Sequence, residues 1–202
     1  AMVKNKAYIG ILLMLACALL WSLNGLSIRL IAWNAFVLAG WRGFFAAAAL
    51  YAAMRLLKYR VVFDGRTALI GACVCATGLL YILANRLTTA ANAIVLQYTS
   101  PVWMMALGII LFGKRFRGVD FAAVALVLGG VALFFFDELT PGGALGNIIA
   151  IIGGCTLAGA YVLMGEAERP RRLSGVLAGL LMMALAGIPF TFLYPPKIAA
   201  AD

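Results

Sequence analysis

The sequence contains no histidine, and only seven of its 202 residues are acidic. A serine protease of the intramembrane kind would therefore lack its usual base. The few Cys, Asp and Glu residues also show no metal-ligand spacing. The last long apolar stretch, about 173–192, has no lysine for a retinal Schiff base, and the chain has no Gly-rich phosphate loop. We therefore expect no enzyme activity, no cofactor and no metal site.

Charged residues are scarce as well, at 11% of the chain, whereas 65% of the residues are hydrophobic and the mean hydropathy is +1.06. This composition predicts an all-α integral membrane protein in a lipid bilayer. The net charge of +9 does not indicate a nucleic-acid partner, because the basic residues form short clusters between apolar spans. Four cysteines, Cys17, Cys73, Cys75 and Cys155, lie inside apolar spans, and we interpret them as small core residues.

The apolar runs predict about seven transmembrane helices. A helix needs roughly 20 apolar residues to cross the bilayer. The runs cover about 8–30, 35–54, 68–87, 92–115, 119–136, 145–164 and 173–192. The sixth run has small residues at four-residue steps, at Gly146, Ala150, Gly154 and Ala158, and such a stripe lets two helices approach closely.

The loops between these spans predict an orientation. Twelve of the 16 basic residues fall at the N-terminus and in the loops after spans two, four and six, all on one side of the membrane. The positive-inside rule places this side in the cytoplasm. The N-terminus of this multi-pass membrane protein is then expected inside the cell.

The fourth span, NAIVLQYTSPVWMMALGIILFGKR, is the most informative stretch. Pro101 removes a backbone donor and is expected to kink the helix. Polar residues beside the kink, with Tyr98 and Trp103, predict a wall that faces a cavity rather than lipid. The alternative is a kinked helix packed inside the bundle without a ligand.

A weak internal repeat relates the two ends of the chain. A shift of 140 positions aligns Trp21 with Tyr161, Gly25 with Gly165 and Arg29 with Arg169. Five helices per repeat would invert the second copy in the membrane, as in many transporters. We therefore expect a first five-helix repeat at 1–140 and the start of a second, inverted repeat of two helices at 141–202.

Three stretches carry a family resemblance: ALLWSLNGLSIR in the first span, GWRGFFAAAAL in the second, and TTAANAIVLQYTSPVWMMALGIILFGKRFRGVDFAAVALVLGGVALF across the fourth and fifth. With these motifs the chain resembles the drug/metabolite transporter superfamily, in particular its EamA-type members with ten helices. One departure is Lys114, where family members often carry an acidic residue, which argues against a loop salt bridge there. A family member would continue for three more helices, so the chain is either incomplete or pairs with another copy.

The resemblance implies a transporter that exports or exchanges small metabolites across the bacterial inner membrane by alternating access. Amino acids are the expected substrates by this comparison, because amino-acid exporters are among the best-known members. An alternative is a non-transporting membrane subunit or a chaperone-like partner protein whose short architecture is native. Further apolar spans encoded beyond Asp202 would favour the transporter.

The candidate substrate-binding residues are aromatic and polar side chains at mid-membrane depth. Such walls suit a solute with an apolar part and a hydrogen-bonding part. They are Trp21, Asn24, Arg42, Tyr81, Tyr98, Trp103 and Tyr161. Arg42 is costly inside a span and has no acidic partner there, so we expect it to bind a substrate carboxylate or hold an outer gate. The alternative is a structural arginine that donates to helix-end carbonyls.

Overall fold

The structure is a computed structural model that describes residues 8, 10–12, 14–20, 28, 30–31, 33–138 and 143–195, without the side chains of 134–138. The chain divides into two compact units, Ala1–Ala32 and Trp33–Asp202, and each is described by itself. In the first unit the apolar helix Gly10–Leu20 is the longest described element.

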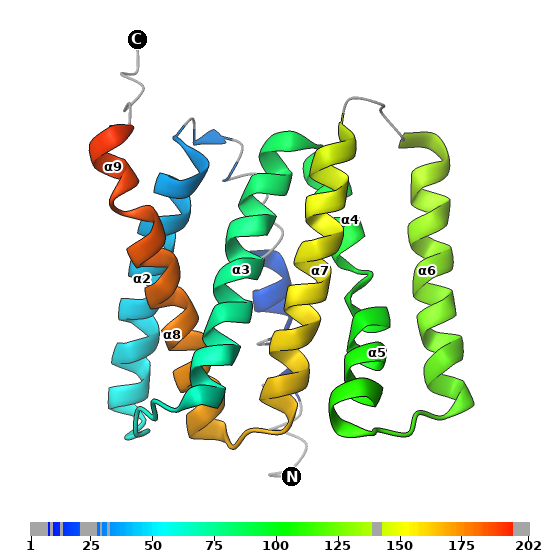
Figure 1. The fold of residues 1–202 in the computed structure, drawn as a ribbon, viewed down its shortest axis with the longest axis horizontal. Helices are drawn as coiled ribbons and strands as arrows, with labels where there is room; N and C mark the ends of the chain where they lie inside the picture. The colour runs from blue at the N-terminus through cyan, green and yellow to red at the C-terminus, as the bar shows by residue number, and fades with distance from the viewer. Residues whose placement is uncertain are drawn as a thin grey trace. The chain divides into compact units, whose positions relative to one another are not determined.

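The second unit is a bundle of helices that run side by side along a common direction (Figure 1). The described part of the chain contains no strand. The helices are α2 (Ala35–Leu56), α3 (Gly65–Leu87), α4 (Ala90–Gln97), α5 (Ser100–Phe112), α6 (Gly118–Glu138), α7 (Ala144–Gly165), α8 (Arg169–Gly187) and α9 (Phe190–Leu193). Helix α2 packs against α8, α8 against α3, and α3 against α7, which also contacts α4 and α5. Helix α6 lies at the edge of the unit beside α4.

Five stretches of the described chain are long and apolar enough to cross a membrane: Ala35–Leu56, Gly65–Leu87, Ala90–Phe112, Ala144–Gly165 and Arg169–Leu193. The prediction of an all-α membrane bundle is therefore confirmed. The other two expected spans fall on helices with shorter apolar parts, Gly10–Leu20 and Gly118–Leu133.

Local sequence signals begin several helices. The Asn34 side chain accepts from the Phe36 N–H at 2.9 Å, and the Thr89 hydroxyl accepts from the Asn92 N–H at 3.0 Å. At α3, Asp64 and Thr67 form a reciprocal capping box with bonds of 2.7 and 2.8 Å. These side chains satisfy N–H groups that a helix start leaves without a partner.

The span that contains Pro101 is divided into two helices. The α4 helix ends at Gln97, and α5 begins at Ser100 with Pro101 in its first turn, where the missing N–H is tolerated. The Thr99 hydroxyl donates to the Leu96 carbonyl at 2.8 Å. A side-chain hydroxyl therefore satisfies a backbone acceptor at the interruption, as membrane helices require.

Small residues let α7 and α8 pack closely against their neighbours. A Cβ atom on Gly146 would lie 2.7 Å from the Leu87 carbonyl carbon, and one on Gly154 would lie 3.2 Å from the Gln97 carbonyl oxygen. The expected small-residue stripe of this helix thus lies against α3 and the α4–α5 interruption. A hydroxyl pair, Thr77 and Thr156 at 2.8 Å, joins α3 to α7 beyond Gly154.

The closest contact between helix backbones joins α2 and α8. A Cβ atom on Gly40 would lie 2.5 Å from the backbone carbon of Gly187, and Gly187 also packs against the Phe36 carbonyl. Above this crossing, the rings of Phe36 and Phe190 stack with their centroids 5.1 Å apart. Glycine is required on both helices because any side chain would meet backbone atoms.

Candidate functional site

Three helices bring Arg42, Tyr81, Asn85 and Tyr98 together. Tyr81 of α3 lies within electrostatic range of Arg42 of α2 and of Tyr98, the residue that ends α4, and Asn85 follows one turn further along α3. Arg42 and Tyr98 are exposed, whereas Tyr81 is half-buried. Asn85 is almost completely buried, at 2% exposure, and its amide nitrogen donates to the Tyr81 carbonyl at 3.0 Å. We call these four residues the polar cluster.

The helical repeat of α3 explains why this cluster forms. Residues 70, 74, 78, 81 and 85 share one face, because steps of three or four residues return to the same side of a helix. Ile70, Val74 and Gly78 of this face pack on Gly175, Gly179 and Met183 of α8. Tyr81 and Asn85 continue the face beyond that contact, where Arg42 and Tyr98 are their neighbours.

Among the side chains that the structure describes, three buried polar atoms lack a hydrogen-bond partner. They are the side-chain oxygens of Asn85 and Asn92 and the indole nitrogen of Trp103. Asn92 is fully buried, and its amide nitrogen reaches the Thr88 hydroxyl at 3.4 Å. An unsatisfied buried polar atom costs free energy, so each such atom requires an explanation. These atoms are two acceptors and one donor, and of the three residues only Asn85 belongs to the polar cluster.

The other expected site residues have different positions. Trp103 lies on α5 and is half-buried, whereas Tyr161 lies on α7 and is 43% exposed. Among the described residues, no interaction joins either ring to the polar cluster. Trp21 and Asn24 lie outside the described residues. The structure therefore brings together Arg42, Tyr81 and Tyr98 from the expected set.

Asn92 was missed by sequence reasoning. It sits in the first turn of α4, three residues after the Thr89 cap, where a polar residue is ordinary. Its burial depends on the neighbouring α7 helix, whose Asn147 accepts from the Thr88 hydroxyl at 2.8 Å. The burial of Asn92 follows from the packing of α3 against α7. The sequence alone gives no signal for it.

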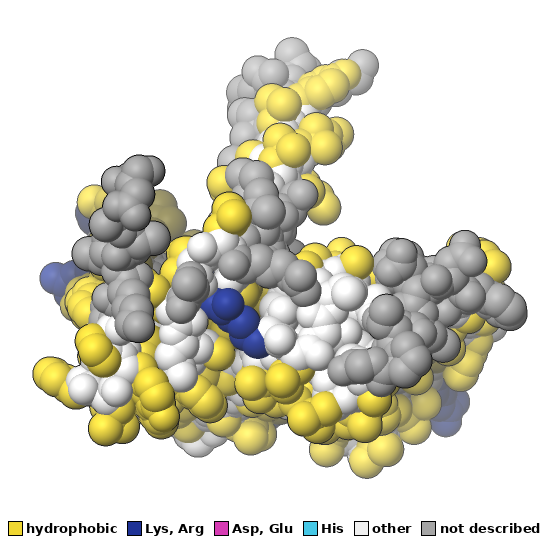
Figure 2. Space-filling view, turned by 90° about the horizontal axis from the view of Figure 1, so that it is seen from above, with side chains coloured by type: hydrophobic (Ala, Val, Ile, Leu, Met, Phe, Trp, Pro, Cys, Tyr) yellow, Lys and Arg dark blue, Asp and Glu magenta, His cyan; other side chains and the backbone are white. Residues whose placement is uncertain are grey.

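Trp41 of α2 contacts α9 and the aromatic residues that follow it in its own helix. Its indole N–H donates to the Thr191 hydroxyl at 3.3 Å, which joins α2 to α9. Its ring also contacts those of Phe44 and Phe45, with centroids 6.0 and 5.9 Å away. Figure 2 shows the face at this end of the protein, with mainly hydrophobic side chains and a basic group near its middle.

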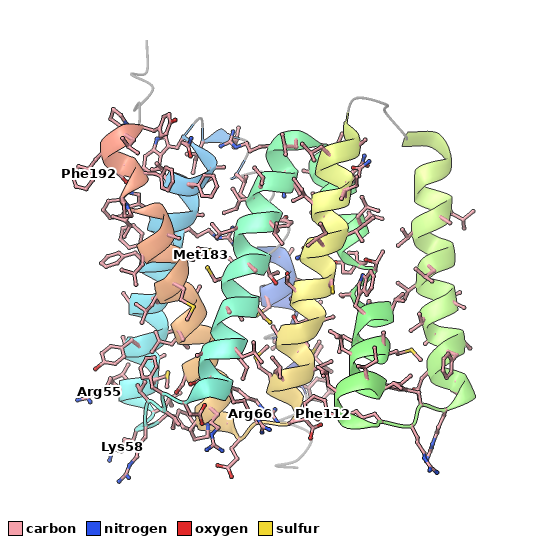
Figure 3. All side chains as sticks on the ribbon, in the orientation of Figure 1. Arg55, Lys58, Arg66, Phe112, Met183 and Phe192 are labelled. Carbon is pink, nitrogen blue, oxygen red and sulfur yellow. The ribbon has the colours of Figure 1, made fainter. Side chains whose placement is uncertain are left out.

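The opposite end of the bundle carries the basic residues, where Arg55, Lys58 and Arg66 lie at the same level as Phe112 and far from Phe192 (Figure 3). Two ion pairs join its loops: Lys114 to Glu166 at 2.6 Å and Arg171 to Asp64 at 2.8 Å. The expectation that Lys114 argues against a loop salt bridge is therefore wrong. A salt bridge forms there with the lysine as its basic member, because the acidic partner comes from the end of α7.

These contacts change the acidity of both carboxyl groups. The Thr67 N–H, with help from the Arg171 guanidinium, lowers the pKa of Asp64 below its ordinary value of 3.8. The bonded Lys114 ammonium lowers the pKa of Glu166 below 4.5. Both shifts arise because the surrounding donors favour the ionised carboxylate.

The described residues include all four cysteines, which with the acidic residues are the possible metal ligands of this part of the chain. No group of three His, Cys, Asp or Glu residues there could hold a metal ion. Cys17, Cys73, Cys75 and Cys155 are free thiols. Cys17 is exposed, so the prediction of a core residue is wrong for that position, whereas the other three are half-buried.

Comparison with known protein families gives one match: the EamA-like transporter family matches residues 8–136, which is more than half of the chain. No curated protein and no solved structure matches the sequence. The matched region contains the first five expected spans and all four residues of the polar cluster. Arg42 lies on α2, Tyr81 and Asn85 lie on α3, and Tyr98 follows α4. The chain belongs to the EamA-like transporter family, and is therefore a multi-pass membrane protein of a family that transports small molecules.

Proposed function

We propose that the protein carries amino acids or similar zwitterionic metabolites across the membrane, by alternating access at the polar cluster. The single observation that carries this proposal is the position of Asn85 one helical turn from Tyr81, with the Arg42 guanidinium within electrostatic range of the Tyr81 hydroxyl. The Asn85 side-chain oxygen is a buried acceptor without a partner, and Arg42 is an exposed positive charge within an apolar helix. A solute with an ammonium and a carboxylate group complements both.

Each group of the cluster has a distinct role in this proposal. The Arg42 guanidinium binds the substrate carboxylate, since its planar fork matches two carboxylate oxygens. The Asn85 side-chain oxygen accepts from the substrate ammonium. Tyr81 and Tyr98 supply flat apolar walls with hydroxyl groups at their tips, and these walls contact the substrate side chain.

The remaining parts of the proposal concern the repeats and the membrane. Residues 1–140 form one repeat and 141–202 begin an inverted second one, so that rocking of the two halves exposes the cluster to each side in turn. The basic end faces the cytoplasm of a bacterial cell, because cytoplasmic loops carry the excess of Lys and Arg. Additional helices, from this chain or from a second copy, complete the pathway.

The test is transport by the purified protein in liposomes loaded with a panel of radiolabelled amino acids. We expect Arg42→Lys to lower the rate about tenfold or more, because lysine keeps the charge and loses the bidentate geometry. Arg55→Lys at the basic end of α2 is the matched control and is expected to transport normally. Wild-type rate and affinity in Arg42→Lys would exclude substrate binding by Arg42, and absence of all amino-acid flux in wild type would exclude this substrate class.

A further inference from the structure

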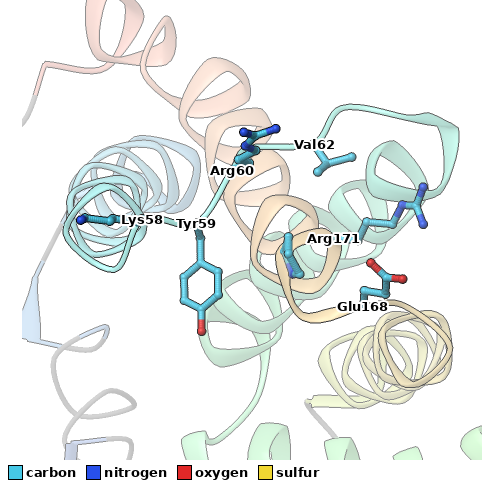
Figure 4. A pocket seen from close by; sticks show the side chains of 7 residues that line it. Lys58, Tyr59, Arg60, Val62, Glu168 and Arg171 are labelled. Atoms are coloured by element: carbon cyan, nitrogen blue, oxygen red, sulfur yellow. The ribbon is translucent and has the colours of Figure 1, made fainter.

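A second candidate site lies at the basic end of the bundle, away from the polar cluster. An open hollow of about 600 Å³ is lined by Lys58, Tyr59, Arg60, Val62, Glu168, Pro170 and Arg171. It lies between the segment that follows α2 and the start of α8 (Figure 4). Lys58, Arg60 and Arg171 stand on different sides of this hollow, which we call the basic hollow.

The backbone at Lys58 is held in a conformation that normally belongs to glycine. Lys58 has φ 57°, and it is the one non-glycine residue with a positive φ in the described part of the chain. Its N–H donates to the Arg55 carbonyl, and the Tyr59 N–H donates to the Met54 carbonyl at 2.9 Å, which ends α2 in a Schellman motif. This backbone conformation favours glycine, whereas the negative end of the α2 dipole favours the lysine charge, so the charge is the property that distinguishes Lys58 from a glycine here.

The start of α8 violates a second local rule. Arg169, Arg171 and Arg172 occupy its first turn, and no side chain caps the helix. The positive end of a helix dipole favours anions and disfavours arginine. Arg171 is paired with Asp64 and Arg172 donates to the Ala167 carbonyl. The other two lining cations, Lys58 and Arg60, still outnumber the single lining carboxylate, Glu168.

The floor of the basic hollow is preformed. Tyr59 and Val61 pack against the core residues Met54 and Leu177, and the Val62 N–H donates to the buried Ser174 hydroxyl at 2.9 Å. The Arg169 guanidinium lies 5.8 Å from the centroid of the Tyr59 ring. The segment that carries Lys58 and Arg60 is therefore fixed to α8, and the charges need only side-chain rotation to converge on a ligand.

The surroundings indicate where such a ligand comes from. Leu56 and Leu57, which precede Lys58, are 82% and 67% exposed, and Phe63 is 68% exposed. In a membrane these side chains contact acyl chains, while the hollow lies at the level of the headgroups. Basic pockets between helices at this depth suit the phosphate of an anionic lipid.

We propose that the basic hollow binds a phosphate group at the membrane surface, as the headgroup of an anionic lipid supplies it. A bound phosphate would explain both the lysine at a position that favours glycine and the arginine residues in the first turn of α8. It would stabilise the lysine charge and the positive end of α8 together. Glu168 limits the affinity by repulsion and makes the site selective for headgroups that also offer a hydrogen-bond donor.

Native mass spectrometry of the full chain in neutral detergent tests this proposal, with phosphatidylglycerol and phosphatidylcholine of identical acyl chains as probes. The double variant Lys58→Gly/Arg60→Gln is expected to bind phosphatidylglycerol at least tenfold more weakly, with unchanged phosphatidylcholine binding. Lys58→Gly keeps the end of α2, since glycine adopts the positive φ without strain. The control Arg115→Gln/Arg117→Gln removes two charges from another loop at the same end and is expected to bind as wild type does.

Glu168→Gln provides a change in the opposite direction. Its side chain makes no capping bond, so the fold is kept while the repulsion is removed, and we expect tighter phosphatidylglycerol binding. Inorganic phosphate distinguishes a free-phosphate site from a lipid-headgroup site. If phosphate alone raises the melting temperature of wild type but not of the double variant, the hollow is a free-phosphate site. If only the lipid raises it, the hollow is a headgroup site. Equal binding of both probes by wild type and all variants would overturn the proposal.

Discussion

The Nζ atom of Lys114 lies 2.6 Å from a carboxylate oxygen of Glu166, and this contact joins the loop after α5 to the end of α7. The backbone carbonyl of Glu166 also accepts from Arg66, at the start of α3, at 3.4 Å. The Arg171–Asp64 pair links α8 to the same start of α3. Four helices are thus connected at the basic end, and in an alternating-access cycle these contacts must separate when that end opens.

Acid is expected to weaken this connected end. The folded protein lowers the pKa of Asp64 and of Glu166, so their contributions to stability are fully present above the ordinary values of 3.8 and 4.5. They are lost as the pH falls through the lower values in the folded protein, because the unfolded state then binds more protons. Melting temperatures measured from pH 7 to pH 3 should decline, and Asp64→Asn combined with Lys114→Met should flatten the decline.

High salt provides the check on that experiment. Both pairs are partly exposed, with side-chain exposures between 34% and 42%, so salt screens them. The difference between wild type and the combined variant should shrink as ionic strength rises. An acid profile that is the same in both proteins would show that other groups govern the acid response.

The close crossing of α2 and α8 gives a test of packing. Gly187→Ala would place a Cβ atom 2.5 Å from backbone atoms of Gly40, and neither backbone can move without separating the helices. Overpacking of this kind costs about 1–3 kcal/mol. Gly129→Ala in α6 is the matched control, because nothing lies within 4 Å of its added methyl group. Alanine there should be neutral or stabilising by up to about 1 kcal/mol.

Thermal unfolding in detergent measures both variants. We expect a clear loss of melting temperature in Gly187→Ala and none in Gly129→Ala. Equal behaviour of the two would mean that α2 and α8 separate easily, and that their crossing is not a fixed contact of the bundle.

Much of the fold follows from hydropathy and helix signals alone. The spans follow from runs of apolar residues, and the interruption beside Pro101 follows from the missing N–H. The Lys114–Glu166 pair could not be predicted in this way, because its members are 52 positions apart and meet only through the packing of α5 on α7. Loop charges predict an orientation, but the partners of these charges depend on which helix ends lie side by side.

The candidate site was predictable only in part, for a similar reason. Arg42 and Tyr81 stand out because a charge and a phenol are costly or unusual inside apolar helices. Asn92 and the Trp103 nitrogen give no such signal, since a capped helix start and an aromatic residue are ordinary at those positions. Their lack of partners is a property of the packed bundle.

The distribution of acidic residues predicts uncoupled transport. The described acidic residues lie at helix ends or in loops: Asp64, Asp120, Asp137, Glu138, Glu166 and Glu168. Proton-coupled carriers usually place a titratable carboxyl group within the membrane. In liposomes we expect a substrate gradient to drive flux, and an imposed pH gradient to leave accumulation unchanged. Uphill accumulation driven by the pH gradient alone would contradict this and would require an acidic residue in further helices.

Cysteine accessibility tests the position of the substrate cavity. Tyr81 belongs to the polar cluster, and Trp103 has a buried nitrogen without a partner, so both are expected to border water-accessible space. Tyr81→Cys and Trp103→Cys, in a background with all four native cysteines changed to serine or alanine, should react with a small water-soluble thiol reagent. Excess amino acid should slow the reaction at position 81 at least, because the substrate contacts Arg42 and Asn85 beside it.

Two further positions make the result interpretable. Arg115→Cys in a loop should react at a high rate that the substrate does not alter, and Ile82→Cys, whose side chain is 1% exposed in the core, should stay unreactive. If positions 81 and 103 resemble position 82, the aromatic side chains serve packing, and the cavity lies elsewhere in the bundle. If position 81 alone is protected, Trp103 faces a separate internal space, and the substrate site consists of the contacts among α2, α3 and α4.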